Sequence, residues 1–190
     1  MSTELQNVVE SLNYMIKNTY QSYYYLTNFI KYTPSTKLAW YHFPYLDLYN
    51  HLVRQSKMNI CLNIWKMYVE KKNESITIHK LNRILHDERQ INHKTTKTFH
   101  KKFKTPIDKI RKQSIAHNDL EKEDYSITLS DMFDILNEIK NNYNEILDKF
   151  SMPNYFITEE HLQKMKNECE VSIDMVFSGN IKETIELNSK

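Results

Sequence analysis

Arg111 and His117 are the pair of residues whose types and spacing best suit a chemical reaction. A guanidinium is a permanent positive fork for phosphate oxygens, and an imidazole can carry a proton near neutral pH. Cleavage of RNA needs little more: a base for the 2′-hydroxyl, an acid for the leaving 5′-oxygen, and positive charge for the phosphorane. This chemistry requires no metal, so we expect no cofactor.

The spacing of the pair limits what one chain can do. On a helix, six residues place the two side chains about 9 Å apart along the axis and about 120° apart around it. One helix can direct both toward the same region, but it does not easily bring both heads onto one phosphate. On spacing alone, the alternative is a helix C-terminus with a surface arginine and a histidine that interacts with the helix dipole.

A basic segment leads into this pair. Between residues 94 and 112 there are eight lysines and arginines and one acid, Asp108, in a chain whose formal net charge is only +2. A basic run is often only a solvated surface, but a local positive field also attracts a polyanion. The residues expected to hold the RNA backbone are Lys101, Lys102, Lys104, Lys109 and Lys112.

The elements that must position these residues are helices. The 190-residue chain contains one glycine and four prolines, too few turn residues for a sheet-rich protein. Apolar spacing predicts an all-α bundle of long antiparallel helices. The expected helices cover residues 3–32, 44–72 and 79–86, a segment that begins at Pro106, and residues 128–152 and 158–177.

Several helix ends carry local signals. Thr105 and Pro106 suit the start of the helix that bears Arg111, because threonine caps a helix and proline fits its first turn. Thr128 and Asp131 have the spacing of a capping box. Gly179 predicts the end of the last helix, since glycine is the preferred residue just beyond a helix.

Cysteines and apolar runs indicate the compartment. Cys61 and Cys169 are isolated, so they form neither a disulfide framework nor a pair with metal-ligand spacing. The first residues lack a secretory signal, and no run approaches the roughly 20 apolar residues of a membrane span. We therefore expect a cytoplasmic protein without a membrane partner.

Two other patterns have a structural and a functional interpretation. Four histidines recur every seven residues, at His79, His86, His93 and His100. Seven residues rise about 10 Å on a helix, too far for neighbouring imidazoles to share one ion, so no metal site is predicted. The tyrosines between 20 and 25 could stack on bases, but a half-buried helix face is the more usual role.

The arginine, five intervening residues and the histidine resemble the Arg-x4–6-His signature of the HEPN superfamily. The segments 47–54, 61–65 and 76–81 resemble the abortive-infection U-type branch, called AbiU-like, in which a long aromatic-rich helix precedes a short one. The similarity covers roughly residues 5–150. One residue departs from the pattern: Lys112 stands where the family commonly has Asn, Asp or His.

The resemblance implies a helical bundle, usually a homodimer, in which the two motifs meet at the dimer interface. It implies metal-independent RNA cleavage in a toxin or antiphage setting, with an antitoxin or other regulatory protein as a possible partner. His117 would be the acid and base, and Arg111 would stabilise the phosphorane. Lys112 can hold phosphate but cannot orient His117, which leaves Asn118 and Asp119 as possible supports.

These expectations give one helical domain over residues 1–190, with a core at about 5–150 and a helical appendage at about 155–180. The function expected is cleavage of single-stranded RNA. The alternatives are a non-catalytic HEPN scaffold or antitoxin-like partner, and a plain helical interaction protein.

Overall fold

The structure, a computed structural model, describes residues 2–31, 46–68, 77–89 and 128–188, and every regular element in these ranges is helical. No strand occurs among them, which confirms the all-α prediction. The elements are α1 (Thr3–Lys31), α3 (Leu46–Tyr68), α4 (Ile78–Arg89), α6 (Leu129–Lys149), the 3₁₀ helix η1 (Pro153–Tyr155) and α7 (Glu159–Asn188).

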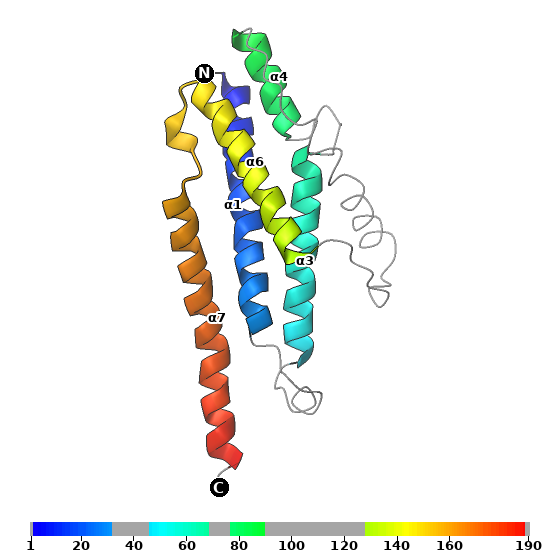
Figure 1. The fold of residues 1–190 in the computed structure, drawn as a ribbon, viewed down its shortest axis with the longest axis vertical. Coiled ribbons are helices and arrows are strands. Elements are labelled where there is room, and N and C mark those ends of the chain that lie inside the picture. Colours follow the sequence, from blue (N-terminus) through cyan, green and yellow to red (C-terminus); the bar gives the residue numbers. More distant parts are fainter. Residues whose placement is uncertain (1, 32–45, 69–76, 90–127, 189–190) are drawn as a thin grey trace.

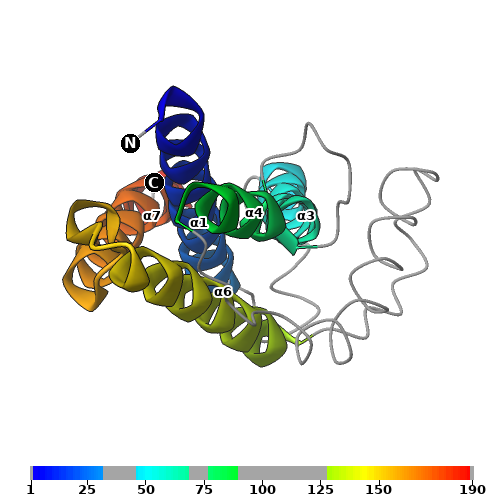
Figure 2. The ribbon, with the colours of Figure 1, turned by 90° about the horizontal axis from the view of Figure 1, so that it is seen from above.

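The helix α1 lies at the centre of the arrangement (Figures 1 and 2). It contacts α3, α4, α6, η1 and α7. In Figure 1, α1 and α7 run downward while α3 and α6 run upward, so the pairs α1–α3 and α6–α7 are antiparallel. Figure 2 places α3 and α7 on opposite sides of α1.

Burial along α1 follows from these neighbours. In its first half the buried residues Leu5, Val8, Val9, Leu12 and Ile16 form one stripe at helical spacing. In its second half the buried positions spread around most of the circumference, because the helix is now covered from several sides. The buried residues of that half are Thr19, Tyr20, Ser22, Tyr24, Leu26, Asn28 and Phe29.

The expected helix over residues 3–32 is confirmed by α1, and that over 79–86 by α4. For the helix over 44–72, α3 confirms the part that the structure describes. At the start of α6, the Asp131 N–H donates to the Thr128 hydroxyl at 3.1 Å and the Thr128 N–H donates to the Asp131 carboxylate at 3.0 Å. The predicted capping box is therefore present. The helix expected to begin at Pro106 lies outside the described residues.

The predicted end of the last helix near Gly179 is wrong, because α7 continues to Asn188. A glycine ends a helix when its backbone turns left-handed, and no glycine in the described chain has a positive φ. Glycine inside a helix costs about 1 kcal/mol relative to alanine, which does not stop a helix of good formers. Lys182, Glu183 and Glu186 follow Gly179 and favour helix.

The helix α6 ends in a Schellman motif that turns the chain toward α7. The Ser151 N–H donates to the Asp148 carbonyl at 2.9 Å, and the Met152 N–H donates to the Leu147 carbonyl at 3.0 Å. Met152 and Leu147 are both buried, as the hydrophobic contact of this motif requires. Ser151 has a φ of 54°, the only positive φ of a non-glycine residue in the described chain.

Replacing Ser151 with glycine should stabilise the protein. A left-handed backbone costs a residue with a Cβ about 1–2 kcal/mol, and the greater freedom of glycine in the unfolded chain offsets part of that gain. We expect Ser151→Gly to raise the free energy of unfolding by about 0.5–1 kcal/mol in urea denaturation. Asn154→Gly, at a nearby exposed residue without a positive φ, is the control and should lower it. Equal losses from both glycines would contradict the prediction.

Candidate functional site

The residues predicted to carry the chemistry all fall between residues 90 and 127, outside the described residues. They are Lys101, Lys102, Lys104, Lys109, Arg111, Lys112, His117, Asn118 and Asp119. The helices on either side of that segment are α4, which ends at Arg89, and α6, whose first residue is Leu129.

Of the upstream segments of the motif pattern, 47–54 and 61–65 lie on α3, and the two halves of this helix differ in exposure. Asp47, His51 and Arg54 are exposed, whereas Cys61 and Ile64 are buried in the core. The polar residues near the start of α3 therefore face solvent, while the apolar residues of its second half pack on α1 and hold the helix in place.

The thiols are not reactive groups in this fold. Cys61 and Cys169 are both free and buried. Burial raises the pKa of Cys61 to about 12, against a smaller lowering by the charge of Lys57, and burial raises the pKa of Cys169 to about 11. Because the thiolate is the nucleophilic form, both side chains act as small apolar core residues.

The tyrosine run belongs to the core, as the structural interpretation predicts. Tyr20 and Tyr24 are buried, and Tyr23 and Tyr25 are half-buried. Tyr23 stacks on Phe133 of α6 with ring centroids 5.3 Å apart, and Tyr25 stacks on Phe29 at 6.1 Å. These rings are therefore largely engaged within the bundle rather than open to bases.

The histidines of the repeat that lie among the described residues do not form a metal site. His79 and His86 lie on α4, and His93 and His100 lie outside the described residues. No group of three or more His, Cys, Asp or Glu side chains among the described residues could hold an ion.

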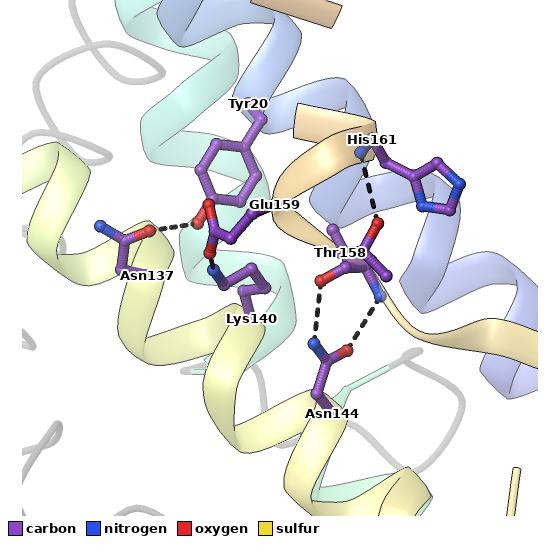
Figure 3. A network of polar contacts seen from close by, with 8 residues as sticks. Tyr20, Asn137, Lys140, Asn144, Thr158, Glu159 and His161 are labelled. Atoms are coloured by element: carbon purple, nitrogen blue, oxygen red, sulfur yellow. Dashed lines mark hydrogen bonds and ion pairs between the residues drawn. The ribbon is translucent and has the colours of Figure 1, made fainter. Parts of the chain in front are cut away.

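A polar junction joins α6 to the start of α7 (Figure 3). Asn137, Lys140 and Asn144 lie on one side of α6 and bind three different partners. The Tyr20 hydroxyl donates to the Asn137 side-chain oxygen at 2.8 Å. The Asn144 side chain accepts from the Ile157 N–H at 3.0 Å and donates to the Ile157 carbonyl at 2.9 Å. The backbone that leads into α7 is therefore fixed by side chains of α6.

The charged member of the junction is Lys140, whose side chain is only 7% exposed and forms an ion pair with Glu159. Glu159 is the first residue of α7, and its side chain is 81% exposed. Thr158 caps the same helix, since its hydroxyl accepts from the His161 N–H at 3.3 Å. A buried ammonium needs a partner, so this pair ties the position of α7 to that of α6.

Burial raises the pKa of Tyr20 well above its usual range and raises that of Tyr24 to about 12; in both cases Glu159 adds to the shift. The Tyr20 hydroxyl is therefore a neutral hydrogen-bond donor. With a paired lysine, two amide side chains and neutral phenols, the junction positions helices and does not supply a catalytic group. The sequence pattern did not predict this junction. The signal in the sequence was the helical spacing of the polar residues Asn137, Lys140 and Asn144 beside an apolar stripe.

None of the helices in the ranges given above combines the length and the apolar character that crossing a bilayer requires. Comparisons of the chain with protein-family models, with curated proteins and with solved structures found no match. A function must therefore be argued from the residues of this chain.

Removing one member of the ion pair should cost more than replacing the buried charge. Glu159→Gln leaves the Lys140 ammonium buried without its carboxylate, and we expect a loss of about 1–2 kcal/mol in the free energy of unfolding, given the exposure of Glu159. Lys140→Met removes the charge and keeps the packing, so its cost should be smaller, and the double variant should resemble it.

The measurement is urea denaturation of the single and double variants. Glu160→Gln is the matched control, because Glu160 is exposed in the same first turn of α7. This substitution removes the same negative charge near the helix N-terminus. If Glu159→Gln and Glu160→Gln have the same effect, the ion pair contributes nothing beyond the helix dipole.

Alkaline pH should destabilise the fold through its buried acids. The pKa values of Tyr20, Tyr24 and Tyr143 are raised above 10.0, and those of the two cysteines above 9.0, by burial. Above these ordinary values the unfolded chain loses protons that the folded chain keeps. The contribution of these groups to stability should therefore be constant below about pH 9 and fall as pH rises toward the raised values.

Tyr20→Phe removes one of these groups. Above about pH 10 it should flatten the fall in the free energy of unfolding by about 1.4 kcal/mol per pH unit, whatever it costs at neutral pH. Urea denaturation across the alkaline range measures the slope. The same slope in Tyr20→Phe and wild type would show that the Tyr20 proton is not linked to folding.

Proposed function

We propose that the protein is an endoribonuclease that cleaves single-stranded RNA without a metal, and that Arg111 and His117 are its catalytic residues. The observation that carries the proposal is the arginine, five intervening residues and histidine that follow a basic segment, in the order seen in HEPN domains. The all-helical architecture is consistent with this family. So is the order of the helices along the chain, with α3 and α4 before residues 90–127 and α6 after them.

The chemistry is an internal transesterification. An imidazole of His117 accepts the proton of the 2′-hydroxyl, whose oxygen forms a bond to the adjacent phosphorus. Arg111 stabilises the negative charge of the phosphorane. The bond from phosphorus to the 5′-oxygen then breaks, and that oxygen takes a proton from an imidazolium, which leaves a 2′,3′-cyclic phosphate. The lysines at 101, 102, 104, 109 and 112 hold the backbone on either side.

The spacing of the pair favours a site shared by two chains. On one regular helix, six residues would separate the two heads by about 9 Å along the axis and about 120° around it, so that they would diverge. Across a two-fold axis, two such helices can bring two arginines and two histidines into one cleft. We therefore propose a homodimer with one composite site.

The same resemblance suggests the setting, an abortive-infection or toxin role in the cytoplasm, with an antitoxin or other regulatory protein as a partner.

A second candidate function is favoured by one residue. Lys112 stands where the family commonly has Asn, Asp or His, so a side chain that could orient the histidine is replaced by a cation. A non-catalytic HEPN-fold scaffold that uses the same dimer face is the function this substitution favours.

Loss of either catalytic residue should abolish cleavage of single-stranded RNA in EDTA. His117→Ala removes the proton carrier and should slow cleavage by about 100- to 10,000-fold. Arg111→Ala removes charge stabilisation worth on the order of 3 kcal/mol in the transition state. His161→Ala, at an exposed histidine on α7, is the matched control and should cleave as wild type does. Each variant should remain a dimer in sedimentation.

A mixed dimer of His117→Ala and Arg111→Ala tests whether the site is shared. It contains one intact histidine and one intact arginine on different chains, so partial activity supports a composite site. If His117→Ala cleaves as well as wild type, the enzyme proposal is wrong and the scaffold replaces it. If the mixed dimer is inactive although wild type cleaves, the chemistry needs both residues in one chain or in duplicate.

A further inference from the structure

The helix α7 extends beyond the bundle that holds its first half. Figure 1 shows α7 continuing past the ends of α1 and α3. Ile173 is the last described residue of α7 that belongs to an apolar core, and the helix continues to Asn188. At about 1.5 Å per residue, the part beyond Ile173 is about 22 Å long. A lone helix of this length is marginal in water, so a second surface packed against it would stabilise it.

The outer side of α7 carries exposed apolar side chains. Leu162, Cys169 and Ile173 are buried against the rest of the bundle. Val171 and Met175 each follow a buried residue by two positions, which places them about 200° further around the helix. Met175 is 73% exposed, more than any other large apolar side chain among the described residues, and Val171 is 52% exposed. Apolar residues therefore occur on both sides of α7, the packed side and the side directed away from α1.

A stripe of residues centred on Met175 runs along this outer side. On a regular helix, the positions four, seven and eleven residues away in either direction lie within about 40° of the central one. Before Met175 these positions hold Val171, Glu168 and Lys164, and after it they hold Gly179, Lys182 and Glu186. Lys164 and Glu168 are exposed. The stripe therefore has opposite charges at equal distances from its centre.

We propose that two copies of the chain pair through this outer stripe of α7, with the two helices antiparallel and a two-fold axis at Met175. Each residue then faces the one that lies equally far on the other side of Met175 in the second copy. Lys164 faces Glu186 of the second copy, and Glu168 faces its Lys182. The symmetry repeats both pairs, so four pairs of opposite charge flank the centre.

The centre of the same arrangement is apolar. Met175 packs on its own copy, and a methionine side chain adapts to the irregular gap at a two-fold axis. Val171 faces Gly179, where the absence of a side chain leaves room for it. An apolar centre with a charged rim is the usual composition of a protein interface.

Other arrangements of two α7 helices oppose like charges. In a parallel pair each residue faces itself, so Lys164 would meet Lys164 and Glu168 would meet Glu168. In an antiparallel pair with its axis two residues earlier, at Ile173, Lys164 would meet Lys182. Like charges directly opposed destabilise a helix pair, so the axis at Met175 is preferred to both.

The charges also favour a second copy over other partners. The stripe holds two lysines and two glutamates and has no net charge, so it does not attract a nucleic acid or an anionic membrane surface. Its pattern is complementary to its own reverse, which a contact with an unrelated protein does not require. The inference does not rest on the proposed function, because neither of the catalytic residues proposed there belongs to α7.

The first test places a charge at the proposed axis. Met175→Glu brings two carboxylates together there, and we expect the Kd of self-association to rise about 100-fold, since opposed like charges at an interface cost several kcal/mol. Tyr14→Glu is the matched control, because Tyr14 is a 70% exposed apolar residue on α1, and it should associate as wild type does. Sedimentation of the full chain over a range of concentrations measures Kd, and circular dichroism checks that each variant is folded.

The second test reverses charges to determine the direction of pairing. Glu168→Lys turns two attractive pairs into repulsive ones and should raise Kd about 10-fold. Adding Lys182→Glu to Glu168→Lys restores opposite charges across the axis and should return Kd to the wild-type value. Glu10→Lys makes the same change at an exposed position of α1 and should leave Kd unchanged.

The outcomes separate this contact from the composite site of the proposed function. If Met175→Glu associates as tightly as wild type, the α7 contact is overturned, whether or not the protein cleaves RNA. If Met175→Glu dissociates but the double charge reversal does not restore Kd, the antiparallel arrangement at Met175 is wrong. A wild type that stays monomeric at micromolar concentration overturns it as well. If both contacts form, wild type sediments as an assembly larger than a dimer, and Met175→Glu reduces that assembly to the dimer.

Discussion

The burial of α1 is the constraint on which the rest of the structure depends. A helix covered from several sides must be apolar around much of its circumference, and its polar atoms must find partners inside the bundle. Two of the buried tyrosines meet this condition in different ways: the Tyr20 hydroxyl donates to Asn137 of α6, and the Tyr143 hydroxyl of α6 donates to the Val9 carbonyl of α1 at 3.1 Å. These two bonds fix the register of α6 against α1.

Once α6 is fixed, its polar side determines where α7 begins. Asn144 holds the backbone of Ile157, and Lys140 pairs with Glu159, so the chain must enter α7 at one place and in one direction. From there the contact is apolar, because Leu162 and Cys169 of α7 join the main core around α1. A lysine 7% exposed contributes little net stability by itself. The buried charge instead disfavours other positions of α7, because those positions would leave the Lys140 ammonium without its carboxylate.

Features that depend on neighbours in sequence were predictable, and those that depend on distant partners were not. The capping box at Thr128 and the extent of α1 follow from residues within a few positions. The helix end predicted at Gly179 was wrong, because a glycine ends a helix only when its backbone turns left-handed, and the residue type alone does not reveal that conformation. The Tyr20–Asn137 bond joins residues 117 positions apart, beyond any local pattern. For the candidate site, the sequence supplies residue types, spacing and order, but the distances depend on residues 90–127.

The described helices show how chemistry could be confined to one part of the chain. Two thiols and three tyrosine hydroxyls are withdrawn into the core, where burial raises the pKa of each and keeps it protonated. Among the charges that remain outside, cations predominate on α3 and carboxylates predominate on α6 and α7. A core that keeps its own reactive groups buried and protonated is independent of which residues would perform a reaction. The same scaffold would therefore serve a nuclease or an inactive RNA-binding partner, and the difference between them would depend on a few residues between α4 and α6.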